Sequence, residues 1–376
     1  MPVSDLLSLS LAVLFPIVAI LATRRRWVPE WSSSIILCYG AGILIANLRG
    51  WEINGPLLEA IAGGSMLVGL PLLLFSVRVR DLLRFGKPML FSFLLCCLAG
   101  VCATGLTALY AQAQVEDVWQ IAGMLTGLYT GGTPNVQAIG LALEAPAEYV
   151  VLIQAADVLL GGAYLLGLLT ILPALYGKIF SPSPVTPDQE PVQNLSDPPA
   201  TWSRWVKQLL AGLSVTAAGF LTTRAVTGAW FDPTALILFI TTLSIVLALS
   251  GATRRIGNSY ALGEYFVLIF CVALGLLADF RQLAEDGLDL LYFSAIALTL
   301  TILVHLLLAK LFRVDRDTVI LSSVAALYGP VFVVQVATAI RNTRLLPAGI
   351  AVSLVGFGIG NYLGIGLAYA LRWMVG

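Results

Sequence analysis

A glycine-rich interruption in an apolar stretch carries most of the polar side chains that could bind a ligand. Residues 119–144 are mainly apolar, but residues 130–135 read Thr-Gly-Gly-Thr-Pro-Asn. Glycine is flexible and proline lacks an N–H, so a helix would open here and leave backbone groups without partners. Hydroxyl and amide oxygens suit a hard cation, and the N-terminus of the following half-helix suits a carboxylate. The residues predicted to bind ion or substrate at this break are Thr130, Gly131, Gly132, Thr133, Pro134, Asn135 and Gln137.

Asp157 is the one acidic residue that lies well inside an apolar run. A carboxylate within a bilayer is costly, and it is by default a functional hypothesis. It could bind Na⁺ together with Thr130, Thr133 and Asn135, or it could carry a proton. The structural alternatives are a protonated Asp157 that is hydrogen-bonded to a neighbouring span, and a break whose Thr and Asn side chains are satisfied locally.

A second interruption, at Tyr328, Gly329 and Pro330, forms a weaker mirror of the first. We include these three residues and Gln335 among the predicted site residues. Asn361 is a further candidate, although its glycine-rich surroundings favour a contact between helices. The other titratable candidate is His305, the sole histidine. It is expected at the inner membrane boundary near Lys310, with a proton relay as the alternative.

The composition defines the environment in which these residues act. Of the 376 residues, 59% are hydrophobic and only 11% are charged, and the mean hydropathy is +0.91. A soluble chain is nearer half apolar and a quarter charged. Because Lys+Arg and Asp+Glu balance at 21 each, no basic surface exists for nucleic acid. The chain is therefore predicted to be an all-α, multi-pass membrane protein with the lipid bilayer as its partner.

Twelve segments are apolar enough to enter the membrane, since about 20 residues of helix cross the hydrocarbon. A proline-rich polar stretch at 179–203 separates the two halves and is predicted to be a flexible cytoplasmic linker. The segments are 6–22, 33–48, 57–77, 89–112, 119–144, 149–177, 206–223, 234–252, 262–278, 290–309, 318–340 and 345–371.

The positions of the basic residues indicate how these segments are threaded. If all twelve cross from an outside N-terminus, 11 Lys and Arg residues fall inside and 10 outside. If the interrupted segments 119–144 and 318–340 enter and return to the same side, 17 fall inside and 4 outside. Basic residues collect on the cytoplasmic side, so the count favours two re-entrant segments that enter from opposite faces of the inner membrane. In the first half, a crossing broken helix compensated by another break within 145–178 would satisfy the count equally.

The two halves also share weak internal similarity. At a constant offset of 198 residues, identical residues cluster around both breaks and again in the spans that follow them. We expect two inverted repeats, 33–178 and 204–376, preceded by an extra N-terminal span and inner loop at 1–32. Inverted repeats with discontinuous helices at the midplane are typical of secondary transporters. The matched residues are Gly131, Val136, Gln137, Gly162, Tyr164 and Leu165 with Gly329, Val334, Gln335, Gly360, Tyr362 and Leu363.

Three stretches resemble the YjcL-like membrane family, which is catalogued as domain of unknown function eight-one-nine. They are Gly69–Phe75 followed by Arg78 to Arg84, the Tyr129–Asn135 motif, and Gly356–Gly364, and the resemblance covers most of residues 33–371. That family is similar to the bile acid/sodium symporters, and the resemblance implies an elevator in which a core domain moves past a panel domain. One departure is Tyr328, where the family usually has the first of two glycines before proline.

These observations predict an ion-coupled secondary transporter, driven by Na⁺ or H⁺, for a small organic solute that is anionic. No cofactor beyond the coupling ion is expected, and the chain is not expected to be an enzyme. A homodimer would suit an elevator. A cation/proton antiporter and a channel are the alternatives. An intramembrane enzyme is disfavoured because neither Asp157 nor His305 has a catalytic partner in the sequence.

Overall fold

The computed structural model is built from helices. It describes residues 3–28, 34–48, 54–75, 87–112, 117–183, 201–277 and 280–375, and within these residues there is no strand. The basic residues Arg49, Arg78, Arg80 and Arg84, and most of the predicted linker (residues 184–200), lie outside the described residues.

The predicted apolar segments correspond to helices or pairs of helices. Nine described helices are long and apolar enough to cross a membrane, and α2 is a shorter apolar helix. The segment predicted at 149–177 is divided, because α8 ends at Leu169 and the short helix α9 follows it. The helices are α1 (Val3–Arg24), α2 (Ser34–Leu48), α3 (Gly55–Leu74), α5 (Lys87–Ala111), α6 (Val118–Gly131), α7 (Thr133–Ala142), α8 (Ala147–Leu169), α9 (Leu172–Ile179), α10 (Trp202–Thr227), α11 (Pro233–Ser250), η1 (Ala252–Ile256), α12 (Tyr260–Leu277), α13 (Phe280–Leu311), α14 (Arg316–Leu327), α15 (Pro330–Ala339), η2 (Thr343–Leu345) and α16 (Leu346–Val375).

Local sequence explains where several helices begin and end. The side chains of Asn54, Asp232 and Asp315 accept hydrogen bonds from the first-turn N–H groups of α3, α11 and α14. These caps satisfy backbone donors that have no partner inside the helix. At the other end, α10 and α11 stop at Gly228 and Gly251, whose φ angles of +76° and +77° suit glycine.

Close helix contacts are made through glycines. A Cβ atom on Gly42 of α2 would lie 2.8 Å from the Cα atom of Gly275 in α12. A Cβ atom on Gly123 of α6 would lie 2.9 Å from the carbonyl oxygen of Gly364 in α16. Small residues let helix backbones approach, which is how helices associate when lipid and protein interior are equally apolar.

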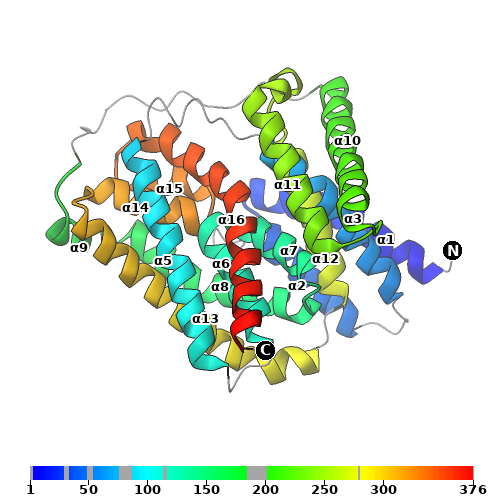
Figure 1. The fold of residues 1–376 in the computed structure, drawn as a ribbon, viewed down its shortest axis with the longest axis horizontal. Helices are drawn as coiled ribbons and strands as arrows, with labels where there is room; N and C mark the ends of the chain where they lie inside the picture. Colours follow the sequence, from blue (N-terminus) through cyan, green and yellow to red (C-terminus); the bar gives the residue numbers. More distant parts are fainter. Residues whose placement is uncertain are drawn as a thin grey trace.

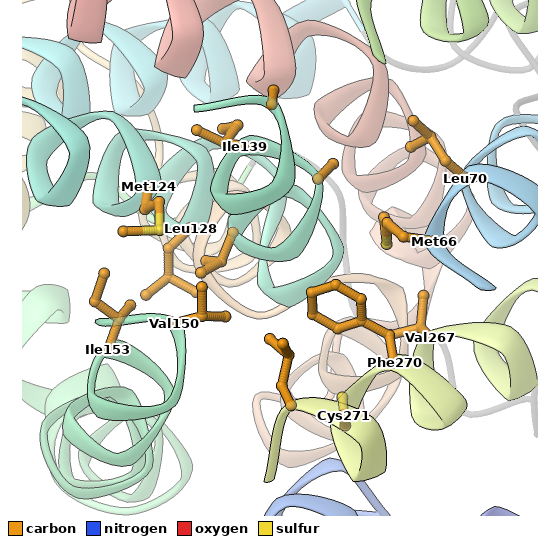
Figure 2. Packing of buried hydrophobic residues seen from close by; sticks show 14 of the residues in the cluster. Met66, Leu70, Met124, Leu128, Ile139, Val150, Ile153, Val267, Phe270 and Cys271 are labelled. Atoms are coloured by element: carbon orange, nitrogen blue, oxygen red, sulfur yellow. The ribbon is translucent and has the colours of Figure 1, made fainter. Parts of the chain in front are cut away.

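The helices gather in two regions. Figure 1 shows α1, α3, α10, α11 and α12 together on the side of the N-terminus, while α5, α6, α8, α9 and α13–α16 occupy the other side. The main apolar core joins the two regions. In Figure 2 its side chains include Met124 and Val150 from the second region, and Met66 and Phe270 from the first.

Candidate functional site

The first interrupted segment folds back as a helical hairpin. Helix α6 ends at Gly131 and is capped by Gly132, whose φ of +81° and ψ of −168° are essentially restricted to glycine, and α7 then begins with Thr133 and Pro134. The Nε2 atom of Gln120, near the start of α6, donates a hydrogen bond of 2.9 Å to the carbonyl oxygen of Leu143, just after α7. The two ends of the segment therefore lie side by side, and the segment is a hairpin.

The second interrupted segment has the same construction. Helix α14 ends at Leu327 and is capped by Tyr328, Gly329 has φ +90° and ψ 179°, and α15 begins at Pro330. Near the open end, Nδ2 of Asn342 donates a 2.7 Å hydrogen bond to Oδ2 of Asp317. Asp317 is buried and also pairs with Arg316 at 2.7 Å. This segment too is a hairpin, whose open end is held by a charge-assisted hydrogen bond.

The tips of the two hairpins meet. A Cβ atom on Gly132 would lie 3.8 Å from the carbonyl carbon of Tyr328 and 3.9 Å from the backbone nitrogen of Gly329. From this point α7 and α15 each start a ten-residue helix, and both N-caps are glycines without a capping side chain. The positive ends of two helix dipoles therefore converge at one place, an arrangement that favours a bound anion. Figure 1 shows α6, α7, α14 and α15 within the body of the molecule.

Helix α16 closes one side of the tip contact. Asn135 is buried, and its Nδ2 atom donates to the carbonyl oxygen of Phe357 at 3.2 Å, whereas its Oδ1 atom has no hydrogen-bond partner. The Oγ atom of Ser353 is also buried without a partner, 3.9 Å from the position of a Cβ on Gly329. Buried polar atoms are nearly always paired, so two unpaired oxygens beside the tips point to a ligand or water.

Asp157 approaches the tip of the second hairpin from α8. A Cβ atom on Gly161 would lie 2.5 Å from Oδ1 of Asp157 and 3.2 Å from Cε1 of Tyr328, so both side chains border Gly161. The Tyr328 hydroxyl donates to the carbonyl oxygen of Gly161 at 2.7 Å. The Asp157 carboxylate is an electrostatic neighbour of Tyr129 and of Tyr328. It is partly exposed, and no described side chain donates a hydrogen bond to it or pairs with its charge.

The remaining predicted residues divide into those near the tips and those elsewhere. Thr133 and Pro134 lie at the start of α7 and are partly exposed, and the Thr130 hydroxyl donates to the carbonyl oxygen of Thr126 at 2.7 Å. Gln137 is buried against α12, where its Nε2 atom is 3.2 Å from Sγ of Cys271. Gln335 is exposed on α15, and no described contact brings it to the tips.

Asn361 and His305 have structural neighbours. The Nδ2 atom of Asn361 donates to the hydroxyl of Thr241 on α11 at 3.1 Å, so the predicted helix contact is confirmed. His305 is fully buried between α5, α13 and α14, where it lies 3.4 Å from the hydroxyl of Ser92. Ser92 in turn is hydrogen-bonded to Ser322, so His305 has polar neighbours inside the protein, and its position at the inner membrane boundary stays a prediction.

The four residues predicted to share a Na⁺ ion do not all have the same neighbours. The side chains of Thr130 and Asn135 both border Gly360 of α16, whereas Asp157 borders Gly161 and Tyr328. Within the described chain, no three His, Cys, Asp or Glu side chains gather as metal ligands. Ser353, Gly161 and Tyr129 were missed by sequence reasoning. Tyr129 directly precedes the first motif, but an isolated serine or glycine in an apolar helix carries no comparable signal.

Known proteins match nearly the whole chain. A family model described as "Protein of unknown function (DUF819)" matches residues 11–374. The chain is also similar to a curated relative, "Uncharacterized membrane protein YjcL" from Bacillus subtilis (strain 168). The two are 26% identical over 364 residues, which cover 92% of this chain and 91% of the relative. Together with the apolar helices, these matches identify a multi-pass integral membrane protein.

Proposed function

We propose that this chain, which belongs to the DUF819 family of membrane proteins of unknown function, is an ion-coupled secondary transporter of a small organic anion. The observation that carries the proposal is the meeting of two helical hairpins at Gly132 and Gly329. Irregular backbone within a bilayer is tolerated where it is buried in protein or lines a wet cavity. Paired breaks of this kind form the binding site in transporters built from repeats.

The chemistry of the tips supports an anionic substrate. Helices α7 and α15 both begin at the tip contact and present free backbone N–H groups there. The Ser353 hydroxyl adds a buried group that lacks a partner. A carboxylate would accept hydrogen bonds from such donors and would be stabilised by both helix dipoles.

The arrangement of helices supports alternating access. On either side of the linker, four described α-helices precede a hairpin and one long helix follows it, which is the order expected of two repeats. We propose that α5–α9 and α13–α16 form a mobile core and that α1–α3 and α10–α12 form the panel that it moves along. Two repeats of opposite orientation allow inward-open and outward-open states of similar free energy.

The polar groups beside the tips support coupling to Na⁺ or H⁺. An anion at the tips lies near the Asp157 carboxylate, and like charges disfavour each other in a medium of low dielectric constant. A cation that accompanies the substrate would offset this repulsion. The unpaired Oδ1 atom of Asn135 is the best placed buried oxygen for Na⁺, because amide oxygens suit hard cations.

Uptake by the purified protein in proteoliposomes tests the proposal. We expect saturable uptake of a labelled carboxylate that is stimulated by an inward Na⁺ or H⁺ gradient and that shows counterflow. Asn135→Ala should weaken the ion dependence, while Asn47→Ala, at an exposed position of α2, should leave it unchanged. Uptake that never saturates would indicate a channel instead. Proton efflux driven by Na⁺ without any solute would indicate an antiporter.

A further inference from the structure

We infer that the transported solute carries an ammonium group as well as a carboxylate, which makes it a short zwitterionic amino acid. This inference rests on the proposed function and assigns Asp157 to the substrate rather than to the coupling ion. It follows from two different chemical environments: the helix N-termini at the backbone of Tyr328, and the Asp157 carboxylate at its ring.

One end of Tyr328 belongs to the carboxylate site. Its carbonyl carbon is within 3.8 Å of the position that a Cβ on Gly132 would take, at the junction of the two helix N-termini. The Ser353 hydroxyl is fully buried, has no partner and lies beside Gly329. A substrate carboxylate would give this hydroxyl the acceptor that it lacks.

The other end of Tyr328 belongs to the ammonium site. Its ring and the Asp157 carboxylate both lie beside Gly161. Tyr129 interacts electrostatically with Asp157, and the Tyr164 ring lies 6.4 Å from the Tyr328 ring between centroids. A carboxylate among aromatic rings attracts an organic ammonium, both by charge and through the faces of the rings.

These neighbours suit an ammonium group better than they suit Na⁺. A hard cation takes several oxygen ligands. Here the hydroxyl of Tyr328 donates to the carbonyl oxygen of Gly161, and that of Tyr129 donates to the carbonyl oxygen of Ser294 at 3.2 Å. Both hydroxyls are therefore directed at backbone rather than at Asp157. Among the described residues the carboxylate has neither a cation nor a hydrogen-bond donor of its own.

The separation of the two environments limits the size of the solute. Tyr328 alone spans the distance between them, because its carbonyl carbon lies at the tip contact and its ring lies at Gly161, beside the Asp157 carboxylate. An amino acid places its two charges within a few bonds of each other, so one small molecule can reach both environments. The ammonium also cancels the repulsion between the substrate carboxylate and Asp157.

A matched ligand series tests the inference. The twenty common amino acids would first be screened by thermal shift on the full-length protein in detergent, since a bound ligand raises the melting temperature. Each amino acid that binds would then be compared with its des-amino carboxylic acid and with its decarboxylated amine. We expect the intact amino acid to bind at least about tenfold more tightly than either analogue, because each analogue leaves one charged or polar group unpaired.

Three variants separate the two ends of the site. Asp157→Asn should reduce the preference for the amino acid over the des-amino acid from about tenfold to near unity. Ser353→Ala should instead weaken the binding of the amino acid and of the des-amino acid by the same factor. Glu59→Gln, which alters an exposed carboxylate on α3, should change neither affinity. Because Ser353→Ala leaves Asp157 in place, it keeps the test informative if Asp157→Asn does not fold.

The outcomes distinguish this inference from the proposed function. If the des-amino acid binds and is taken up as well as the amino acid, with dependence on Na⁺ or H⁺, the transporter stands and the ammonium site is overturned. The ammonium site is also overturned if the Asp157→Asn variant keeps the full preference for the amino acid over the des-amino acid. If no member of the series and no other small carboxylate is taken up under either gradient, the proposed function itself has failed.

Discussion

Gly356 of α16 lies directly against Gly131 at the end of α6: a Cβ atom on Gly356 would be 3.2 Å from the Cα atom of Gly131. It would also press into the carbonyl oxygen of Thr130. The unwound end of the first hairpin is therefore supported by the backbone of another helix. The stability of the tip contact depends on glycine at this position.

Gly356→Ala should consequently disturb the first hairpin. Forcing a methyl group into a filled space between backbones costs about 1–3 kcal/mol. We expect a lower melting temperature in detergent and strongly reduced uptake. Gly366→Ala is the matched control on the same helix, because nothing lies within 4 Å of its Cβ position. Equal melting temperatures for the two variants would contradict the close approach of α16 to α6.

A substitution at the tip itself tests the backbone geometry. Gly132→Ala introduces a side chain at φ +81° and ψ −168°, a conformation that costs other residues about 1–3 kcal/mol. We expect a comparable loss in the free energy of unfolding and an altered Km for uptake. Gly162→Ala on α8 is the control, since its Cβ position is open and alanine favours a helix. A Gly132→Ala variant with unchanged stability would mean that the break adopts another conformation.

The open end of the second hairpin can be tested by a double-mutant cycle. Asn342→Ala removes the hydrogen bond to the buried Asp317 carboxylate, and bonds to charged groups contribute about 1.5–3 kcal/mol. Asn342→Ala, Asp317→Ala and the double variant would be compared by chemical unfolding. We expect a coupling free energy between roughly 0.5 and 3 kcal/mol. Strictly additive effects would show that the two side chains do not hold the hairpin closed.

Movement of the core along the panel predicts an effect of cross-linking α11 to α16. Asn361 and Thr241 lie within hydrogen-bond distance across this boundary. With the native cysteines replaced, oxidation of a Thr241→Cys/Asn361→Cys variant should arrest uptake, and reduction should restore it.

The control for that experiment lies within the core. The hydroxyls of Thr104 on α5 and Thr126 on α6 are 2.6 Å apart, and both helices belong to the proposed mobile part. Oxidised Thr104→Cys/Thr126→Cys should therefore continue to transport. An α11–α16 cross-link that forms fully without slowing uptake would argue against sliding at this boundary.

Local composition was sufficient to predict the class of protein and the position of both breaks. Apolar length defines a membrane helix wherever it occurs, and glycine and proline interrupt a helix through their own backbones. The distribution of basic residues then indicated that residues 119–144 and 318–340 return to the side from which they enter. In the structure both segments are hairpins, because Gln120 reaches Leu143 and Asn342 reaches Asp317.

Only the tertiary structure decided what surrounds the breaks. It placed Gly132 against Gly329, Ser353 beside Gly329 and Asp157 against Gly161, whereas Gln335 was left exposed and His305 was buried. In a membrane helix, the side that faces lipid and the side that faces protein are both apolar, so periodicity does not reveal which residues point inward. Residues far apart in the sequence meet through backbone contacts at glycines, and such contacts exist only once the helices have packed.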